Sequence, residues 1–250
     1  MKPLNHKVAV ITGSSRGIGA ATAILLAKAG ANVVINYHRS EKEALHVLEK
    51  VEATGQKGIA VQADVRKKED VKKLVNEAVH AFGKVDILVS NANIAFAFKP
   101  FMEMSWNEFS TKLNDELRST FHLCQEVVPY MDKQGGGKIV LISSGLSRTP
   151  AEGFIAHGTA KAAVATFAKY LAQELGPKNI ATNVIAPGLV LTDATKDQPQ
   201  EMHDSIRELT PLKRLAEPED VAGAVLSLVA DWNTYMNGVY LPINGGSDMS

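Results

Sequence analysis

His157 and Lys161 lie four positions apart in the stretch GFIAHGTAK. An α-helix would place their side chains on one face, one turn apart. A lysine ammonium disfavours the charged form of a nearby imidazole, so we expect this histidine to be mostly neutral at neutral pH. A neutral imidazole can still donate its N–H to a carbonyl oxygen and polarise the carbonyl. The pair is therefore a candidate site for carbonyl chemistry.

A glycine-rich turn near the start of the chain is the second candidate for chemistry. In VAVITGSSRGIGAATAILLAKAG, an apolar run ending at Ile11 passes through Gly13, Gly17 and Gly19 into an Ala-rich helical sequence. Glycine permits a tight turn and lets a phosphate approach the backbone at a helix N-terminus. Ordinary turns also use glycine, but the strand before and the helix after form the context of a dinucleotide-binding turn.

Two arginines near this turn indicate which dinucleotide would bind. An acidic residue at the end of the second strand favours NAD, because it hydrogen-bonds the ribose hydroxyls. The second strand here ends NVVINYHRS, with Tyr37 in the acidic residue's place, followed by His38, Arg39 and Ser40; Arg16 lies in the glycine turn. Two guanidinium groups can hold a 2′-phosphate through charge-assisted hydrogen bonds. The sequence therefore predicts NADP(H), unless both arginines are ordinary surface charges.

The elements that must position these residues alternate along the chain. Short runs rich in Val and Ile, mostly without polar alternation, are typical of parallel strands buried on both faces. Between them, apolar residues recur at helical spacing or Ala-rich segments occur. This order predicts an α/β fold, a doubly wound parallel sheet of about seven strands flanked by helices, as one domain over residues 1–250. The expected strands are 8–11, 32–36, 58–62, 86–89, 138–142, 183–186 and 238–243, and the clearest helices are 17–29, 41–54, 67–82 and 158–175.

One segment, 190–215, is irregular and polar and contains Pro199 and Pro211. A segment of this kind beside a site is a candidate lid.

Composition excludes several classes of function. The 250 residues carry 27 basic and 27 acidic side chains, so no excess charge favours nucleic acid. The lone Cys124 allows no internal disulfide and suits a reducing compartment. No apolar run is long enough to span a membrane and no signal segment is present, which predicts a cytoplasmic protein. The seven histidines show no metal-ligand spacing, so we expect no metal.

Several motifs, in order, resemble those of the short-chain dehydrogenase/reductase family. The turn has the spacing Thr12-Gly13-x-x-x-Gly17-x-Gly19. The end of the chain is similar to the bacterial 3-oxoacyl-acyl-carrier-protein reductases, and the resemblance covers nearly the whole chain. The matching stretches are ADV at 63–65, SNAN at 90–93, KLNDEL around Asn114, ISS at 142–144, APGLVLTD at 186–193, PLKRLAEPEDVAGAVLSL and NGVYLPINGG.

The resemblance implies a Rossmann-type fold and a set of catalytic roles. Family members carry Tyr-x-x-x-Lys on one helix, a serine about a dozen residues earlier and a helix asparagine. Carried over, Ser144 holds the substrate oxygen, Lys161 contacts the nicotinamide ribose and Asn114 supports a proton-relay water. His157 stands where the tyrosine acid is expected. Three interpretations stay open: a substitute acid or electrophile, a degraded site that binds cofactor without turnover, or a packing residue.

A second departure lies in SNAN, where the family usually has Asn-Asn-Ala-Gly, so Ser90 and Asn93 differ from the pattern. Asparagine tolerates glycine-like backbone conformations better than most residues. The cofactor-binding residues that the sequence and the resemblance together predict are Gly13, Ser15, Arg16, Gly17, Ile18, Gly19, His38, Arg39, Ser40, Asp64, Val65, Asn91, Ala92, Asn93, Lys161, Pro187, Gly188, Val190 and Thr192.

The expected function is an NADPH-dependent ketoreductase with an atypical Ser-His-Lys site. Its candidate substrates include 3-oxoacyl thioesters, with acyl carrier protein as a candidate partner. The resemblance also implies a homotetramer, with the helix at 158–175 contributing to a subunit interface. The alternatives are an NADP(H)-binding scaffold or regulatory partner without turnover, and an epimerase or dehydratase on the same fold. Phe96, Phe98, Phe101, Met102 and Met104 either line a substrate pocket or pack the start of a helix.

Overall fold

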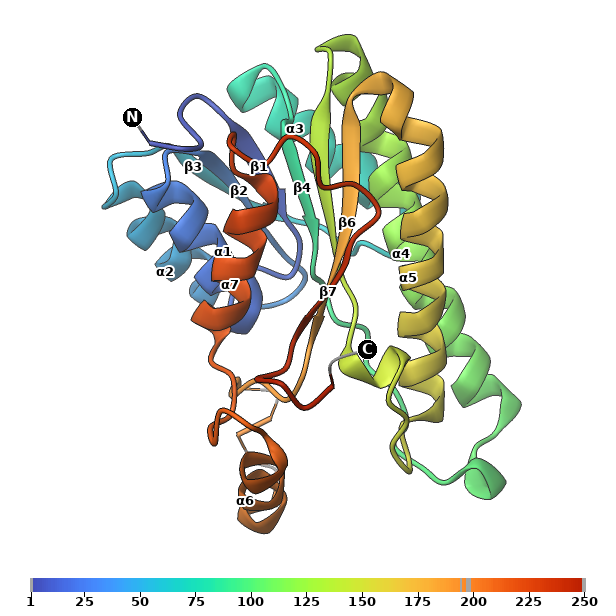
Figure 1. The fold of residues 1–250 in the computed structure, drawn as a ribbon. Helices are drawn as coiled ribbons and strands as arrows, with labels where there is room; N and C mark the ends of the chain where they lie inside the picture. Colours follow the sequence, from blue (N-terminus) through green and yellow to red (C-terminus); the bar gives the residue numbers. More distant parts are fainter. Residues whose placement is uncertain (1, 194, 197–198, 249–250) are drawn as a thin grey trace.

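A seven-stranded, all-parallel sheet forms the centre of the computed structural model, which describes residues 2–193, 195–196 and 199–248. The strand order is β3-β2-β1-β4-β5-β6-β7 (Figure 1). The chain order reverses between β1 and β4, and ligands of such sheets bind at this switch point, outside the carboxyl ends of the strands. The strands are β1 (Val8–Ile11), β2 (Asn32–Tyr37), β3 (Gly58–Gln62), β4 (Ile87–Ser90), β5 (Gly137–Ile142), β6 (Ile180–Pro187) and β7 (Tyr240–Ile243).

Helices cover both faces of the sheet (Figure 1). Helices α1, α2 and α7 contribute to one apolar cluster, and α3, α4 and α5 contribute to the other. Helix α6 stands apart from the sheet, beyond the carboxyl ends of the strands (Figure 1). The helices are α1 (Gly17–Lys28), α2 (Glu41–Glu52), α3 (Lys68–Phe82), α4 (Trp106–Lys133), α5 (Ile155–Leu175), α6 (Gln200–Leu209) and α7 (Pro218–Val229).

The strands are apolar on both sides because each side faces a helical layer. In β2, Val33 and Ile35 belong to the cluster under α1, α2 and α7, whereas Val34 belongs to the opposite cluster. Alternate side chains of a strand point to opposite faces, so a strand buried on both faces shows no polar alternation. The predicted doubly wound sheet of about seven strands is therefore confirmed.

Two parts of the chain differ from the expectation. Helix α4 is the longest helix of the described chain, with 28 residues, and it is absent from the clearest predicted helices. The irregular segment 190–215 contains α6, whose N-cap is Pro199. A lid role for this segment stays a prediction, and its residues 194, 197 and 198 lie outside the described residues. Among the described helices, none is long and apolar enough to cross a membrane.

Candidate active site

The glycine turn between β1 and α1 has the geometry of a phosphate-binding loop. Gly13 and Gly17 have positive φ angles of 60° and 56°, which L side chains rarely adopt. A Cβ on Gly19 would lie 2.5 Å from the Gly13 carbonyl oxygen, so only glycine fits there. Ser15 and Ile18 are half-buried in the same turn. The α1 N-terminus has no side-chain cap on its first N–H groups, and such groups are available to an anion.

Hydrogen bonds join this turn to the end of β4. The Thr12 hydroxyl accepts from the backbone N–H groups of Asn91 and Ala92 at 3.0 and 3.1 Å. The Asn91 amide donates to the carbonyl oxygens of Thr12 and Gly13 at 2.9 and 3.2 Å. Asn91 and Ala92 therefore act on the cofactor loop through its backbone. Asn93 is exposed and does not have a positive φ, so it does not use the glycine-like conformation that asparagine tolerates.

Asn36 is a site residue that the sequence analysis missed. Its side-chain oxygen accepts from the Gly13 N–H at 3.1 Å, and its amide donates to the Ala63 carbonyl at 3.1 Å. Asn36 is buried, so these bonds fix the turn against β2 and the end of β3. A polar residue within an otherwise apolar strand, NVVINY, was the signal available in the sequence.

Positive charge gathers beside the turn. Arg16 and Arg39 are exposed, and within the described part of the chain neither forms an ion pair at contact distance. His38 Nε2 lies 3.7 Å from an Asp64 carboxylate oxygen. A bidentate bond with Arg66 holds the pKa of Asp64 down to about 2, so this carboxylate is already neutralised. The surface is thus suited to a phosphate.

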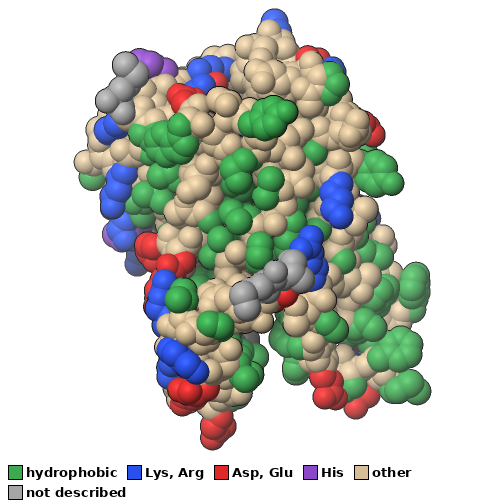
Figure 2. Space-filling view, viewed as in Figure 1, with side chains coloured by type: hydrophobic (Ala, Val, Ile, Leu, Met, Phe, Trp, Pro, Cys, Tyr) green, Lys and Arg blue, Asp and Glu red, His purple; other side chains and the backbone are tan. Residues whose placement is uncertain are grey.

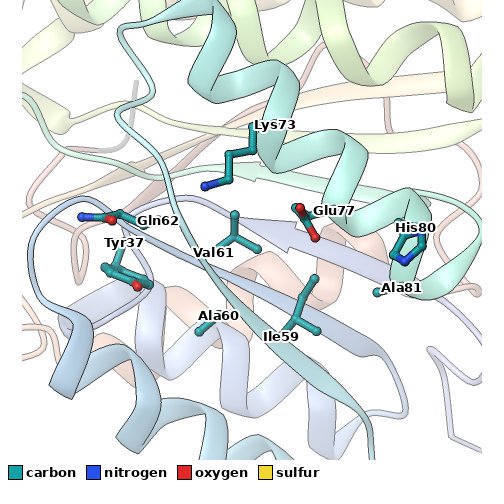
Figure 3. A pocket seen from close by; sticks show the side chains of 9 residues that line it. All are labelled: Tyr37, Ile59, Ala60, Val61, Gln62, Lys73, Glu77, His80 and Ala81. Atoms are coloured by element: carbon teal, nitrogen blue, oxygen red, sulfur yellow. The ribbon is translucent and has the colours of Figure 1, made fainter.

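Other residues predicted to bind the cofactor follow the carboxyl ends of β2 and β3. Val65 is buried, and Ser40 is half-buried at the N-cap of α2 with its hydroxyl free of a capping bond. Tyr37 is buried, and its hydroxyl bonds to Glu41 at 3.2 Å, so it does not replace the acidic residue as a ribose ligand. Figure 3 shows a hollow beside Tyr37, at the β3 edge of the sheet. The side of the hollow opposite β3 is lined by α3, through Lys73, Glu77 and His80.

The segment after β6 reaches back to the glycine turn. β6 ends at Pro187, and the Gly188 N–H donates to the Ile243 carbonyl at 2.9 Å. Val190 forms a parallel bridge with Ala216. A Cβ on Gly17 would lie 3.3 Å from Thr192 Cγ2. Both halves of the predicted cofactor site therefore meet at the carboxyl ends of the strands.

Lys161 lies on the floor of this site. Its ammonium donates to the Ile142 carbonyl at 2.8 Å and to Glu116 Oε1 at 2.6 Å. The Ser143 hydroxyl donates to the Lys161 carbonyl at 2.9 Å, which ties α5 to the end of β5. Ser144 is half-buried at the N-cap of a single 3-10 turn (Gly145–Ser147), where its oxygen accepts from the Leu146 N–H at 3.2 Å. Ser144 keeps its O–H to donate.

The structure places Glu116, and not the predicted site residue Asn114, beside Lys161. Asn114 is exposed, whereas Glu116 is buried and bonds to Lys161. Two residues along an α-helix correspond to about 200° of rotation, so both cannot face the same partner. The α4 helix also buries Lys112, whose ammonium donates to Glu116 Oε2 at 2.5 Å and to the Ile94 carbonyl at 2.7 Å. The sequence analysis missed both charged residues.

His157 lies one turn before Lys161 and under an aromatic ring. The ring centroids of His157 and Phe96 are 4.6 Å apart. Burial, followed by the charges of Lys161 and Lys112, lowers the pKa of His157 to about 3, with Glu116 opposing them. Among the described residues its buried Nδ1 has no hydrogen-bond partner. The imidazole is therefore neutral at pH 7, as the spacing of His157 and Lys161 predicts.

A wall of aromatic rings leads from His157 to the surface. Phe154 lies 6.0 Å from Phe96 and 4.9 Å from Phe98, between ring centroids, and Phe98 is 63% exposed. Figure 2 shows two lobes at this end of the molecule, each of which carries apolar and acidic side chains. Phe101 and Met102 are exposed and Met104 is half-buried, so the first two do not pack the helix start. The α6 side contributes the exposed Leu209 and Leu212.

The pH dependence of stability tests the burial of His157. An unfolded histidine has a pKa of about 6.5, and the folded site keeps the pKa near 3. Between these values the unfolded state binds more protons, so the free energy of unfolding falls as pH falls, by up to about 1.4 kcal/mol per pH unit. His157→Gln is expected to remove this slope, measured by urea unfolding at several pH values from neutral to acid. Parallel profiles for both proteins would contradict the burial.

Comparisons with known proteins agree with this geometry. The family model described as Enoyl-(Acyl carrier protein) reductase matches residues 13–248. A 3-oxoacyl-(acyl-carrier-protein) reductase FabG of Staphylococcus epidermidis is 36% identical over 244 residues, covering 98% of this chain and all of the relative. The 7alpha-hydroxysteroid dehydrogenase of Escherichia coli is also 36% identical, covering 97% of this chain and 94% of its own.

Solved structures show the same likeness. A 7 alpha-hydroxysteroid dehydrogenase complexed with NADH and 7-oxo glycochenodeoxycholic acid superposes with a TM-score of 0.93 at 36% identity, covering 97% of this chain and 94% of that one. A short chain dehydrogenase from Burkholderia cenocepacia in complex with NADP gives 0.91 at 34% identity, covering 99% of this chain and all of that one.

Proposed function

The chain belongs to the short-chain dehydrogenase/reductase family, whose members here are oxidoreductases acting on CH–OH and C=O groups, and from this premise we propose that it is an NADP(H)-dependent ketoreductase. The observation that carries the proposal is the position of His157 and Lys161. They lie on one face of α5, which bonds through Ser143 to the end of β5, at the same sheet edge as the glycine turn. A reacting carbonyl and a dinucleotide would meet there.

The residues of the turn fit a dinucleotide, because Gly13, Gly17 and Gly19 allow the tight turn into the N-terminus of α1 and because the guanidinium groups of Arg16 and Arg39 are exposed. We propose that the two guanidinium groups hold a 2′-phosphate. Gly13, Gly17 and the first N–H groups of α1 would hold the pyrophosphate. Lys161 would hold the nicotinamide ribose with its remaining N–H. When bound, the nicotinamide supplies the hydride to the carbonyl carbon or takes it from the alcohol.

The chain's own groups act on the substrate oxygen. His157 holds a proton on a ring nitrogen and donates it in a hydrogen bond to the carbonyl oxygen, as a neutral electrophile. The Ser144 O–H is the second donor. Negative charge that develops on this oxygen is stabilised by the cluster of Lys112, Glu116 and Lys161, which carries a net charge of one positive unit. Because the imidazole is already neutral, the proton that completes the alcohol comes from solvent.

Restoring tyrosine at position 157 tests this proposal. A tyrosine hydroxyl is a stronger acid than a neutral imidazole N–H, and a positioned acid contributes at least about 100-fold. We therefore expect His157→Tyr to raise kcat on simple ketones by about tenfold or more, allowing for an imperfect fit under Phe96. His157→Phe is the matched control, because it keeps an aromatic ring and removes the donor. Equal turnover by all three proteins would show that position 157 does not touch the reaction.

A second function is favoured by the same pKa. An imidazole that stays neutral to a pH of about 3 is a poor proton donor, which suits a protein that binds NADP(H) as a scaffold or regulatory partner without turnover. Fluorescence titration with NADPH and a ketone screen over roughly pH 5.5 to 8.5, the range in which an unperturbed histidine titrates, separate the two functions. Binding without turnover anywhere in that range would favour the scaffold.

The substrate in this proposal is an apolar ketone, with 3-oxoacyl thioesters and acyl carrier protein as candidate substrate and partner. The aromatic wall from Phe96 to Phe98 supports an apolar chain or ring system beside the carbonyl. We also propose a homotetramer, supported by a hollow on the outer face of α4 and α5 where Phe121 and Phe167 lie 6.3 Å apart. A single domain and a cytoplasmic location stay predictions.

A further inference from the structure

A continuous line of contacts leads from Lys161 through α4 and back to His157. Lys161 bonds to one oxygen of Glu116 at 2.6 Å, and Lys112 bonds to the other at 2.5 Å. The Lys112 ammonium also lies 5.5 Å from the centroid of the Phe96 ring, and Phe96 lies against His157. The line therefore joins the two side chains of α5 that carry the proposed chemistry.

Stability alone does not account for these charges. The Lys112 side chain is fully buried, and Glu116 and Lys161 are 4% and 7% exposed. Removing charges from water costs several kcal/mol per ion, and apolar residues of similar volume often give equal or greater stability. The second half of the buried face of α4, including Leu123 and Val127, shows that this helix packs well on apolar side chains. The charges therefore need another explanation.

The hydrogen bonds of Lys112 and Lys161 leave few of their ammonium N–H groups free to bind a ligand. Lys112 uses two N–H groups, on Glu116 and the Ile94 carbonyl, and directs its charge toward Phe96. Lys161 uses two, on Glu116 and the Ile142 carbonyl, and keeps one. An ammonium has three donors, so Lys161 is fixed in place with a single N–H for a ligand.

We propose that Lys112 and Glu116 are positioning residues of this site: Glu116 fixes the Lys161 ammonium, and Lys112 fixes both Glu116 and the Phe96 ring that covers His157. The inference rests on the proposed function, because it gives Lys161 and His157 their ligands. The charged groups that act on His157 are Lys161 on its own helix and Lys112 and Glu116 on α4. Lys112 therefore controls the charge beside the imidazole as well as its cover.

Lys112→Met tests the proposal, because methionine keeps an unbranched side chain and removes the charge. The cluster becomes neutral and Phe96 loses its partner, and both changes favour protonation of His157. We expect the titration midpoint of the His157 imidazole, followed by NMR and assigned with His157→Gln, to rise by about one pH unit or more. The dissociation constant of NADPH should rise about fivefold or more, because Glu116 without Lys112 no longer holds the Lys161 ammonium in one position. Lys178→Met, which breaks the exposed ion pair with Asp132 at the other end of α4, is the matched control and should change neither.

A second variant separates loss of positioning from loss of folding. Lys112→Met/Glu116→Gln removes both charges and keeps the net charge of the cluster at one positive unit. We expect it to fold, to keep the low midpoint of His157 and to lose affinity for NADPH about fivefold, because Lys161 has lost its carboxylate. The proposal is overturned if Lys112→Met leaves both the midpoint and the NADPH affinity unchanged, or if the double variant binds NADPH like the wild type. A wild-type protein that binds no NADPH would instead overturn the proposed function, and the NMR titration would still test the inference.

Discussion

Glu116→Gln is expected to lower the free energy of unfolding by about 3–5 kcal/mol, because the change leaves two buried ammonium groups against a neutral amide. Glu116 is the shared partner of Lys112 and Lys161, and Lys112 is fully buried. Urea unfolding at pH 7 measures the loss, read from the midpoint at constant m value. Asp132→Asn is the matched control on the same helix, since Asp132 pairs with Lys178 at the surface, and exposed pairs contribute about 0–1 kcal/mol.

The pH dependence of this loss has a definite sign. Burial already lowers the pKa of Lys112 in the wild type, and removing Glu116 removes the charge that opposes this shift. The unfolded lysine therefore binds a proton that the folded variant releases, so the stability of the variant rises with pH until the ordinary lysine pKa of about 10.4. The difference between the wild type and Glu116→Gln should shrink from pH 7 to pH 9. A loss below about 1 kcal/mol at pH 7 would show that the cluster is not charged as described.

Arg39→Asp is expected to weaken NADPH binding by about 100-fold and to leave NADH binding within about threefold of the wild type. A charge-assisted hydrogen bond contributes about 1.5–3 kcal/mol, and the new carboxylate adds repulsion toward a 2′-phosphate. The same carboxylate can accept from a ribose hydroxyl, which favours NADH. Calorimetry with NADPH and with NADH gives the two dissociation constants.

Lys42→Asp is the control for Arg39→Asp. It makes the same change of charge three residues further along the chain, on the exposed side of the first turn of α2. We expect it to change NADPH affinity less than about threefold, because exposed charges at a distance are screened by salt. Equal effects of the two variants would mean that general surface charge, rather than a phosphate contact at Arg39, sets the preference.

The strands were predictable because their physical cause is local. Runs such as VAVI and GIAVQ are apolar at every buried position, and both strands begin and end where the runs do. Helix α4 was not predictable in this way, since the first half of its buried face consists of Lys112, Glu116, Ser119 and Thr120. Apolar residues do recur every four positions in this half of the helix, at Phe109, Leu113, Leu117 and Phe121, but they are half-buried or exposed, and the fully buried positions beside them are polar. The pattern of apolar residues therefore does not identify the buried face that carries the charged residues of the site.

The site was partly predictable for a related reason. Matching of short sequence motifs located His157, Lys161 and the glycine turn, because each of these motifs is defined by a few residues at fixed spacing. The same matching chose Asn114 because the expected residue type stood near the expected place, whereas helical rotation brings Glu116 to Lys161. The depth of the shift in the pKa of His157 also depends on Phe96, which lies 61 positions away in the chain. Contacts of that kind exist only once the chain is folded.

The dependence of Lys112 on Glu116 couples the two positions energetically. A chain with Glu116 but without Lys112 would hold one buried ion pair with Lys161, whereas a chain with Lys112 but without Glu116 would hold two buried like charges with no counter-ion between them. Loss of the carboxylate while Lys112 remains is therefore expected to destabilise the fold far more than loss of Lys112 alone.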